Sequence, residues 1–262
     1  MPRFEPFDWY EQPLFYDLIF DEGTETEARF LEAAHERYGR TRGRKVMEPA
    51  CGTGRLMAAL VKRGWMARGL DCEPGMVDFA AKRLRRFGRR ARATLGRMEA
   101  FTTRERFDLA HCLVSSFKHL PTEGQAVSHL RCVADALKPG GVYVLGLHLT
   151  EYEETRRSRE RWTATDGRRS VVCNIQSWPP DRRSRTERVR ARMTIDEPGK
   201  PARRLEAHWT FRTYSAHELR RVLRAVPELD HAATHDFTHD IDRTIEIDSD
   251  QLDLVLILRR RR

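Results

Sequence analysis

The strongest constraint on this chain is a regular alternation of strand and helix patterns between residues 45 and 150. Short apolar runs such as FDLAHCLVS and VYVLGLHL are typical of strands that are covered on both faces. Amphipathic stretches with helical spacing separate these runs, and glycine or proline marks their ends. Because parallel strands joined by helices form right-handed crossovers, the pattern predicts an α/β fold with helices on both faces of a parallel sheet.

The pattern changes on both sides of this alternation, which predicts four segments. They are an aromatic N-terminal segment with a helix (1–44), the α/β core (45–150), an antiparallel β insertion (151–212), and a C-terminal helix with closing strands (213–262).

Local signals place elements within the flanking segments. Thr24 and Glu27 have the spacing of a capping box, which predicts the start of a helix, and the residues before them are expected to be extended. Ser215 and Glu218 have the same spacing at the start of the C-terminal helix. The insertion alternates polar and apolar side chains, which predicts three exposed strands, at RSVVCNIQSW, RVRARMTID and LEAHWTFRTY.

Length and composition exclude several classes of protein. The 262 residues suffice for one large domain with an insertion. No apolar run approaches the roughly 18 residues of a membrane span, and the start MPRFEPFDWY lacks the apolar core of a secretory signal. The five cysteines include no CxxC pair, which favours reduced thiols over a disulfide framework or a zinc site. We therefore expect a cytoplasmic protein without a membrane partner.

The net charge of +9 raises the question of a nucleic-acid partner. Only six of the 48 basic residues are lysine, and such an excess of arginine is typical of a GC-rich genome. The arginines are spread along the chain, with short clusters at 83–92 and 259–262. Scattered charge is a weaker nucleic-acid footprint than a basic stripe, so nucleic acid is not the expected partner.

A glycine-rich turn, Glu48-Pro-Ala-Cys-Gly-Thr-Gly54, follows the first core strand directly. Small residues at 50, 52 and 54 allow a ligand to approach the backbone. Asp71 follows at the end of the second strand, where an acidic side chain accepts hydrogen bonds from ribose hydroxyls. The turn lacks both the G-x-G-x-x-G spacing and a P-loop lysine, which favours a nucleoside without phosphate, and the charge of Glu48 suits a cationic ligand.

With these motifs the chain resembles the class I S-adenosylmethionine-dependent methyltransferases over residues 45–148. The matching motifs are EPACGTGR, GLDCEPGMVDFA, GRMEAF, FDLAHCLVSSFKHL and LKPGGVYVL, in family order and spacing. FDLAHCLVSSFKHL and the aromatic YEQPLFYDLIF are similar to the small-molecule branch, which includes N-methyltransferases of glycine and of amino sugars. The resemblance implies a Rossmann-like methyltransferase fold, with a mostly parallel seven-stranded sheet and the antiparallel insertion after the fifth strand.

The resemblance also implies a cofactor, S-adenosyl-L-methionine, with S-adenosyl-L-homocysteine as its product. Glu48 and the first turn would face the methionine part, Asp71 the ribose, and residues near Met98 the adenine. Many relatives carry an acidic residue where this chain has Arg97, so adenine recognition is expected from Glu99 or the backbone. The implied cofactor-binding residues are Tyr16, Glu48, Ala50, Cys51, Gly52, Gly54, Arg55, Asp71, Cys72, Met76, Met98, Glu99, Cys112, Leu113 and Phe117. For Asp71, a helix cap is the alternative; for Met76, core packing; and for both Cys51 and Cys72, small apolar fillers.

Three side chains are candidates for the acceptor site, where a base helps if the acceptor must lose a proton. His119, in SSFKHL, and His148 both follow core strands at their carboxyl ends, and Tyr10 lies in the aromatic segment that folds over the cofactor in this branch. For His119 the alternative is a helix-start histidine satisfied by the backbone, for His148 a strand-end polar residue, and for Tyr10 packing of the first helix. The insertion adds Trp162, Trp178, Trp209 and Arg212 as candidate lining residues. His231, His235 and His239 recur every fourth residue, but their segment reads as a strand and a loop, so no metal site is expected.

The leading functional hypothesis is methyl transfer to a nitrogen or oxygen of a small metabolite. A nucleic-acid methyltransferase is a second reading, although HCLVSSF lacks the Asn/Asp-Pro-Pro-aromatic turn of amino-directed DNA enzymes. A non-catalytic cofactor-binding protein is a third, because binding a cofactor does not prove catalysis. The expected partner is a small-molecule acceptor, and the expected assembly is a monomer or a homodimer.

Overall fold

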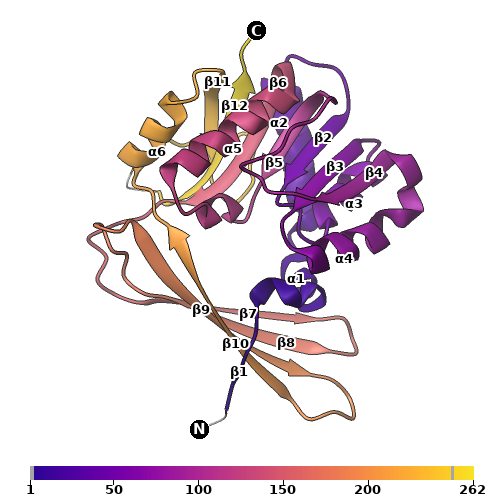
Figure 1. The fold of residues 1–262 in the computed structure, drawn as a ribbon, viewed down its shortest axis with the longest axis vertical. Helices are drawn as coiled ribbons and strands as arrows, with labels where there is room; N and C mark the ends of the chain where they lie inside the picture. The colour runs from indigo at the N-terminus through magenta and orange to yellow at the C-terminus, as the bar shows by residue number, and fades with distance from the viewer. Residues whose placement is uncertain (1–2, 249–250) are drawn as a thin grey trace.

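Two β-sheets at opposite ends of the molecule define the architecture of the protein, which was obtained as a computed structural model (Figure 1). The structure describes residues 3–248 and 251–262. One end is an α/β core, the other is an antiparallel sheet, and helix α1 (Pro13–Phe20) lies between them.

The core is a seven-stranded sheet with the order β11-β12-β6-β5-β2-β3-β4. Each neighbouring pair from β6 to β4 is parallel, whereas β12 runs antiparallel to both β6 and β11. This arrangement confirms the predicted α/β fold with a mostly parallel sheet. The strands are β2 (Lys45–Pro49), β3 (Met66–Asp71), β4 (Ala91–Leu95), β5 (Phe107–Cys112), β6 (Leu137–His148), β11 (Leu229–His235) and β12 (Asp253–Arg260).

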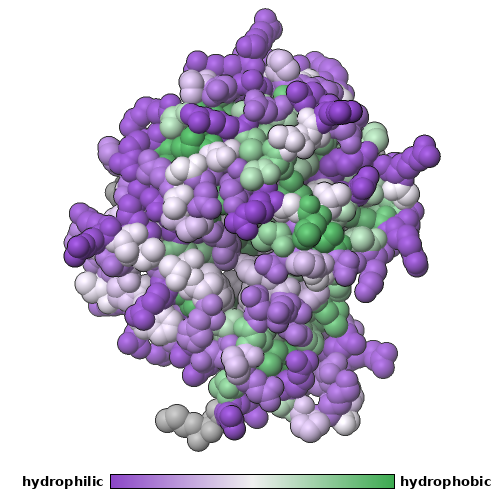
Figure 2. Space-filling model, in the orientation of Figure 1, coloured by the Kyte–Doolittle hydropathy of each residue, from purple (hydrophilic) through white to green (hydrophobic). Residues whose placement is uncertain are grey.

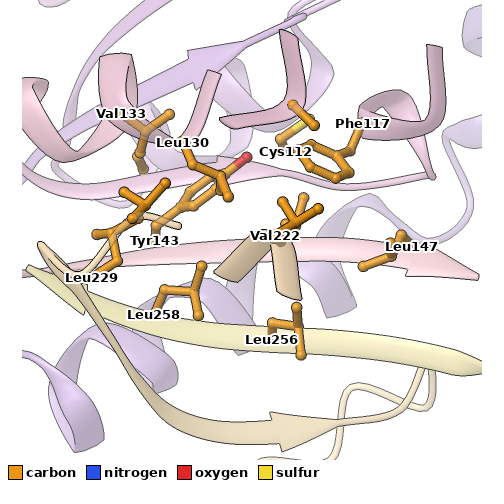
Figure 3. Close-up of a cluster of buried hydrophobic side chains, with 14 of the residues drawn as sticks. Cys112, Phe117, Leu130, Val133, Tyr143, Leu147, Val222, Leu229, Leu256 and Leu258 are labelled. Atoms are coloured by element: carbon orange, nitrogen blue, oxygen red, sulfur yellow. The ribbon is translucent and has the colours of Figure 1, made fainter. Parts of the chain in front are cut away.

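Helices cover both faces of this sheet, as the alternating pattern predicts. Helices α2, α3 and α4 bury one face with a cluster that includes Leu31, Leu60 and Val144. Helices α5 and α6 bury the other with a cluster that includes Leu130, Tyr143 and Val222 (Figure 3). The helices are α2 (Thr24–Tyr38), α3 (Arg55–Lys62), α4 (Pro74–Leu84), α5 (Glu123–Ala136) and α6 (Ala216–Arg224), with short 3₁₀ turns at Trp9–Glu11, Arg85–Arg90 and Ser116–His119.

The second sheet has five strands in the order β1-β10-β9-β8-β7. Three of them match the three predicted strands of the insertion, but β7 was missed. Trp162 is the one large apolar side chain of β7, and the strand lies at an exposed edge, so its sequence lacks a clear alternation. The strands are β1 (Glu5–Pro6), β7 (Ser158–Thr165), β8 (Ser170–Ser177), β9 (Thr186–Asp196) and β10 (Arg203–Arg212).

Two expectations for the N-terminal segment are wrong. Residues 13–20 form helix α1 rather than extended chain, because PLFYDLIF packs against the inner face of the second sheet and Pro13 suits a first helical position. Helix α2 begins without a capping box, since its N-cap is Gly23. The side chains of Thr24 and Glu27 instead bind the buried guanidinium of Arg55. The capping box of α6 is present as predicted.

Glu123, at the start of α5, links the second sheet to the core through ion pairs. Its carboxylate accepts hydrogen bonds from Arg221 of α6 (2.6 Å) and from Arg185, which precedes β9 (2.8 Å). These guanidinium groups, Arg221 first, lower the pKa of Glu123 to about 2. Because the folded-state pKa lies below the ordinary value of 4.5, the stabilisation is complete above that value and is lost as the pH falls toward 2.

We expect Glu123→Gln to lower the free energy of unfolding by about 1–2 kcal/mol at pH 7, a value reduced for solvent screening of the ion pairs. Urea unfolding at pH 7 and at several lower pH values measures the effect. The difference in free energy of unfolding between variant and wild type should disappear as the pH falls from 4.5 to 2. The exposed control Glu36→Gln should have the same free energy of unfolding as wild type. A gap that does not change with pH would rule out the ionic role.

The outer surface in the view of Figure 2 is predominantly hydrophilic over both sheets. Within residues 3–248 and 251–262, no helix combines the length and apolarity that a membrane crossing requires.

Candidate active site

The first turn of the core has a left-handed backbone at its three small residues. Ala50, Gly52 and Gly54 have φ values of 58°, 49° and 69° between β2 and α3. These are left-handed values, which cost little for glycine. A Cβ atom on Gly54 would lie 3.2 Å from that of Ala80 in α4, so the turn also requires glycine for close packing. Backbone and small side chains therefore form this wall of the site.

Asp71 closes the turn from the end of β3. Its Oδ2 accepts a hydrogen bond from the backbone N–H of Gly52 (2.7 Å), and its Oδ1 accepts one from Glu73 (3.0 Å). Burial raises the pKa of the carboxyl, whereas the N–H donors act to lower it. These two hydrogen bonds hold the turn together. Because each carboxylate oxygen can accept a further hydrogen bond, Asp71 can also bind a ligand hydroxyl.

Glu48, at the end of β2, has a buried carboxylate oxygen, Oε2, without a hydrogen-bond partner. Its other oxygen lies 3.7 Å from Nδ1 of His111, whose ring is fully buried. Burial raises the pKa of Glu48 well above its usual range and lowers that of His111 to about 3. An unpaired buried carboxylate is costly, and a cationic ligand group next to the turn would offset that cost.

Helix α1 is held against the turn by a buried polar cluster. The hydroxyl of Thr53 donates to Asp17 (2.7 Å), and Arg83 of α4 also donates to Asp17 (2.7 Å). The ring of Tyr16, the residue before Asp17, therefore lies over the turn. Its Cε1 atom is 3.8 Å from the position that a Cβ atom on Gly52 would take. The aromatic N-terminal segment thus covers the turn.

A cavity of about 890 Å³ lies between the core and the inner face of the second sheet. Its core side contains Leu113, the 3₁₀ turn at Ser116–His119 and His148. Aromatic rings dominate the rest of the lining, from Trp9, Tyr10, Tyr16, Phe20, Trp162, Trp209, Phe211 and Phe237. Such a mixture of apolar rings and a few polar groups is typical of a small-molecule pocket.

Two histidines of this cavity differ in their partners. Nε2 of His119 is 2.6 Å from the hydroxyl oxygen of Tyr10, and burial, with a smaller contribution from Lys118, lowers the pKa of His119 to about 4. Nδ1 of His148 instead forms a hydrogen bond with Asp253. Burial also lowers the pKa of Lys118, although its ammonium pairs with Glu187 at 3.3 Å.

The other predicted cofactor residues lie at different depths. Leu113 lines the cavity, whereas Cys112 and Phe117 point into the core between α5 and β6 (Figure 3). Cys51 and Met76 are buried, and Cys72 is exposed after β3.

On the adenine side of the predicted site, Glu99 is paired with Arg97 at 2.7 Å, so the arginine that departs from the family pattern neutralises the neighbouring carboxylate. The carbonyl oxygen of Met98 pairs with Nδ1 of His129 (3.0 Å). Arg55 is committed to Glu27 (2.6 Å) and Thr24 (3.0 Å).

Of the insertion residues, Trp162 and Trp209 line the cavity. Trp178 is instead surrounded by the guanidinium groups of three arginines, and Arg212 donates to the carbonyl oxygen of Pro121. The three spaced histidines lie on β11 and in the turn after it. The part of the chain that the structure describes holds no group of three or more His, Cys, Asp or Glu side chains placed to bind a metal.

A family model described as a methyltransferase domain matches residues 46–141. This span holds the glycine turn, Asp71 and the strands that carry them. Residues 46–141 are therefore similar to the methyltransferase domains of this family. A protein of Geobacillus sp. (strain WCH70) whose name places it among the methyltransferases is 23% identical over 140 residues. The match covers 52% of this chain and 56% of that relative, so it spans little more than half of each.

Solved methyltransferase structures are similar to this chain over nearly its whole length. An S-adenosylmethionine-dependent methyltransferase from Clostridium acetobutylicum has a TM-score of 0.75 at 16% identity, over 94% of this chain and 96% of its own. The amino pentose methyltransferase CalS10 from Micromonospora echinaspora has a TM-score of 0.69 at 18% identity, over 99% and 100%. The sugar N-methyltransferase KedS8 from Streptoalloteichus has a TM-score of 0.69 at 18% identity, over 100% of this chain and 97% of its own.

Sequence reasoning missed several charged residues of the cavity, among them Lys118, Glu187 and Asp253. Lys118 stands next to His119 in the SSFKHL motif, and its burial is not apparent from the motif. Glu187 and Asp253 lie in the insertion and the last strand, far from the motifs along the chain. Only the antiparallel pairing of β12 with β6 signals the place of Asp253 beside His148.

Proposed function

We propose that this methyltransferase transfers the methyl group of S-adenosylmethionine to a nitrogen or oxygen atom of a small metabolite by in-line displacement. The observation that carries the proposal is the junction of two features: a glycine turn closed by Asp71, and an aromatic cavity that begins at Tyr16 above that turn. The first suits a nucleoside with a cationic amino-acid part. The second has room for an acceptor beside it.

When bound, S-adenosylmethionine supplies a methyl group already activated on a sulfonium. The chain's part is therefore to bind, orient and exclude water. Asp71 would accept the ribose hydroxyls, and the unpaired oxygen of Glu48 would bind the ammonium of the methionine part. Ala50, Gly52 and Gly54 would let that part approach the backbone, and Tyr16 and Leu113 would cover it.

Four of the remaining cofactor positions keep the roles that the resemblance implies. Cys72 and Met76 would pack against ribose and adenine, and Met98 and Glu99 would lie beside the adenine. Arg55 would steady the turn through its bonds to α2. Cys51, Cys112 and Phe117 would support the site from the core.

On the acceptor side, Tyr10, His119 and His148 place polar atoms among aromatic walls. Tyr10 and His119 form one hydrogen-bonded pair. Burial raises the pKa of Tyr10 and lowers that of His119, so both can orient an acceptor group without carrying charge. The names of CalS10 and KedS8 refer to an amino pentose and to sugar nitrogen, which supports an amine on a small polar molecule as the first acceptor to test.

Methyl transfer to a panel of amines and hydroxyl compounds, amino sugars included, tests the proposal by the mass gain of the acceptor. We expect wild type to methylate at least one of them and His119→Ala to lower kcat/KM for it about tenfold, because Tyr10 loses the partner that orients it. The exposed control His217→Ala should match wild type. Methylation of RNA but of no compound in the panel would contradict the small-molecule assignment.

A further inference from the structure

A histidine–aspartate pair lies at the core side of the cavity, where strands β6 and β12 meet. His148 is the last residue of β6 and Asp253 is the first of β12, and the antiparallel register places the two directly opposite each other. Nδ1 of His148 forms a hydrogen bond with Oδ1 of Asp253. Both side chains line the cavity and are about half exposed, at 46% and 44%. The pair is therefore accessible to a molecule in the cavity.

The ring of His148 is oriented from several sides. The backbone N–H of His148 donates to the hydroxyl of Ser115, in the loop after β5 (3.3 Å). Phe237 contacts the ring edge-on, with centroids 4.9 Å apart. Because Asp253 engages Nδ1, the remaining nitrogen, Nε2, is the one available to a ligand. A carboxylate that accepts from Nδ1–H keeps Nε2 unprotonated and able to accept a proton.

His119, one of the two other histidines that line the cavity, is poorly placed for that task. Its Nε2 is already hydrogen-bonded to Tyr10, and the neighbouring ammonium of Lys118 disfavours a second positive charge. His148 has the opposite surroundings, since its direct partner is an anion. Of these two histidines, His148 is the one whose ring contacts a carboxylate.

We propose that Nε2 of His148 accepts the proton of the methyl acceptor, and that Asp253 is a positioning residue that orients the imidazole and balances its charge. The inference rests on the proposed function. In the step, a bond forms between the acceptor atom and the methyl carbon, and the carbon–sulfur bond breaks with its electron pair going to sulfur. The proton of the acceptor passes to Nε2 of His148.

Other charged groups face this pair from the neighbouring elements. Asp236, in the loop after β11, and Lys118, in the 3₁₀ turn, act on Asp253 with opposite signs. Glu187 of β9 pairs with Lys118, and Arg243 lies 3.3 Å from Asp236, so both of these groups have their own counter-ions. Asp253 is the one that contacts the imidazole directly.

The test combines a spectroscopic and a kinetic measurement. In protein with ¹⁵N-labelled histidine, the nitrogen shifts of His148 should report the Nδ1–H tautomer in wild type and a loss of it in Asp253→Asn, whose amide can donate to Nδ1 instead. With an accepted substrate, His148→Ala should lower kcat about 100-fold and Asp253→Asn at least tenfold, with KM little changed. Asp240→Asn, an exposed carboxylate between β11 and β12, is the control and should behave as wild type.

The outcomes separate this inference from the proposed function. If wild type binds S-adenosylhomocysteine but methylates no small molecule, the proposed function fails, and the proton-transfer role of His148 fails with it. If wild type methylates an acceptor and both His148→Ala and Asp253→Asn keep its kcat, only this inference is overturned. An unchanged tautomer in Asp253→Asn would remove the positioning role of Asp253.

Discussion

Replacing Asp71 with alanine is expected to weaken the binding of S-adenosylhomocysteine at least tenfold, which corresponds to about 1.4 kcal/mol. The carboxylate stands at the end of β3, is 8% exposed, and holds the N–H of Gly52 in place at 2.7 Å. The substitution removes both the acceptor for the ribose hydroxyls and the tie that shapes the glycine turn. Hydrogen bonds to a charged group contribute about 1.5–3 kcal/mol each, so the loss should be large.

Calorimetric titration measures this loss of affinity, and two further variants serve as comparisons. Asp71→Asn keeps the size and one acceptor oxygen, so its affinity should fall between those of wild type and Asp71→Ala. Asp78→Ala removes a carboxylate from the exposed side of the following helix and should bind as wild type does. Equal affinities for Asp71→Ala and wild type would show that Asp71 acts only as a local cap for the backbone.

Arg83→Ala is expected to lower the free energy of unfolding by about 2 kcal/mol and to weaken cofactor binding severalfold. The variant leaves Asp17, which is 8% exposed, with Thr53 as its remaining hydrogen-bond donor. Removing one partner of a buried ion pair costs about 3–5 kcal/mol, and the partial exposure of this pair reduces the figure. Because Asp17 anchors α1, the ring of Tyr16 above the turn should become less well held.

Urea unfolding and calorimetry of the same samples measure the two effects of Arg83→Ala together. Arg85→Ala, from the exposed side of the same chain segment, is the control and should change neither quantity. A destabilised variant with unchanged affinity would show that α1 does not shape the cofactor site. Unchanged stability would mean that the ion pair contributes nothing.

The sequence predicts the core of this molecule well because its signals are local. The strand-turn-helix pattern around Gly52 and Gly54 depends on residues close along the chain, and the backbone of the turn follows from their small size. The same is true of the capping box at Ser215, which the structure contains. Local patterns of this kind survive folding because tertiary packing supports them.

The errors arise where distant contacts decide the structure. Thr24 does not cap α2 because Arg55, which lies 31 residues further along the chain, takes its hydroxyl. Strand β7 has little apolar alternation because it is an exposed edge strand, and its neighbour β8 supplies its hydrogen bonds. Asp253 reaches His148 through strand pairing across 105 residues, which no local motif encodes. The lining of the cavity was therefore harder to predict than the glycine turn.

Calorimetric titration of the wild-type protein with S-adenosylhomocysteine tests the central claim most directly. The account predicts saturable binding in the micromolar range, with one molecule bound per chain. The sample must first be shown to be folded and free of copurified cofactor. A folded, cofactor-free sample that binds neither S-adenosylhomocysteine nor S-adenosylmethionine would contradict the account.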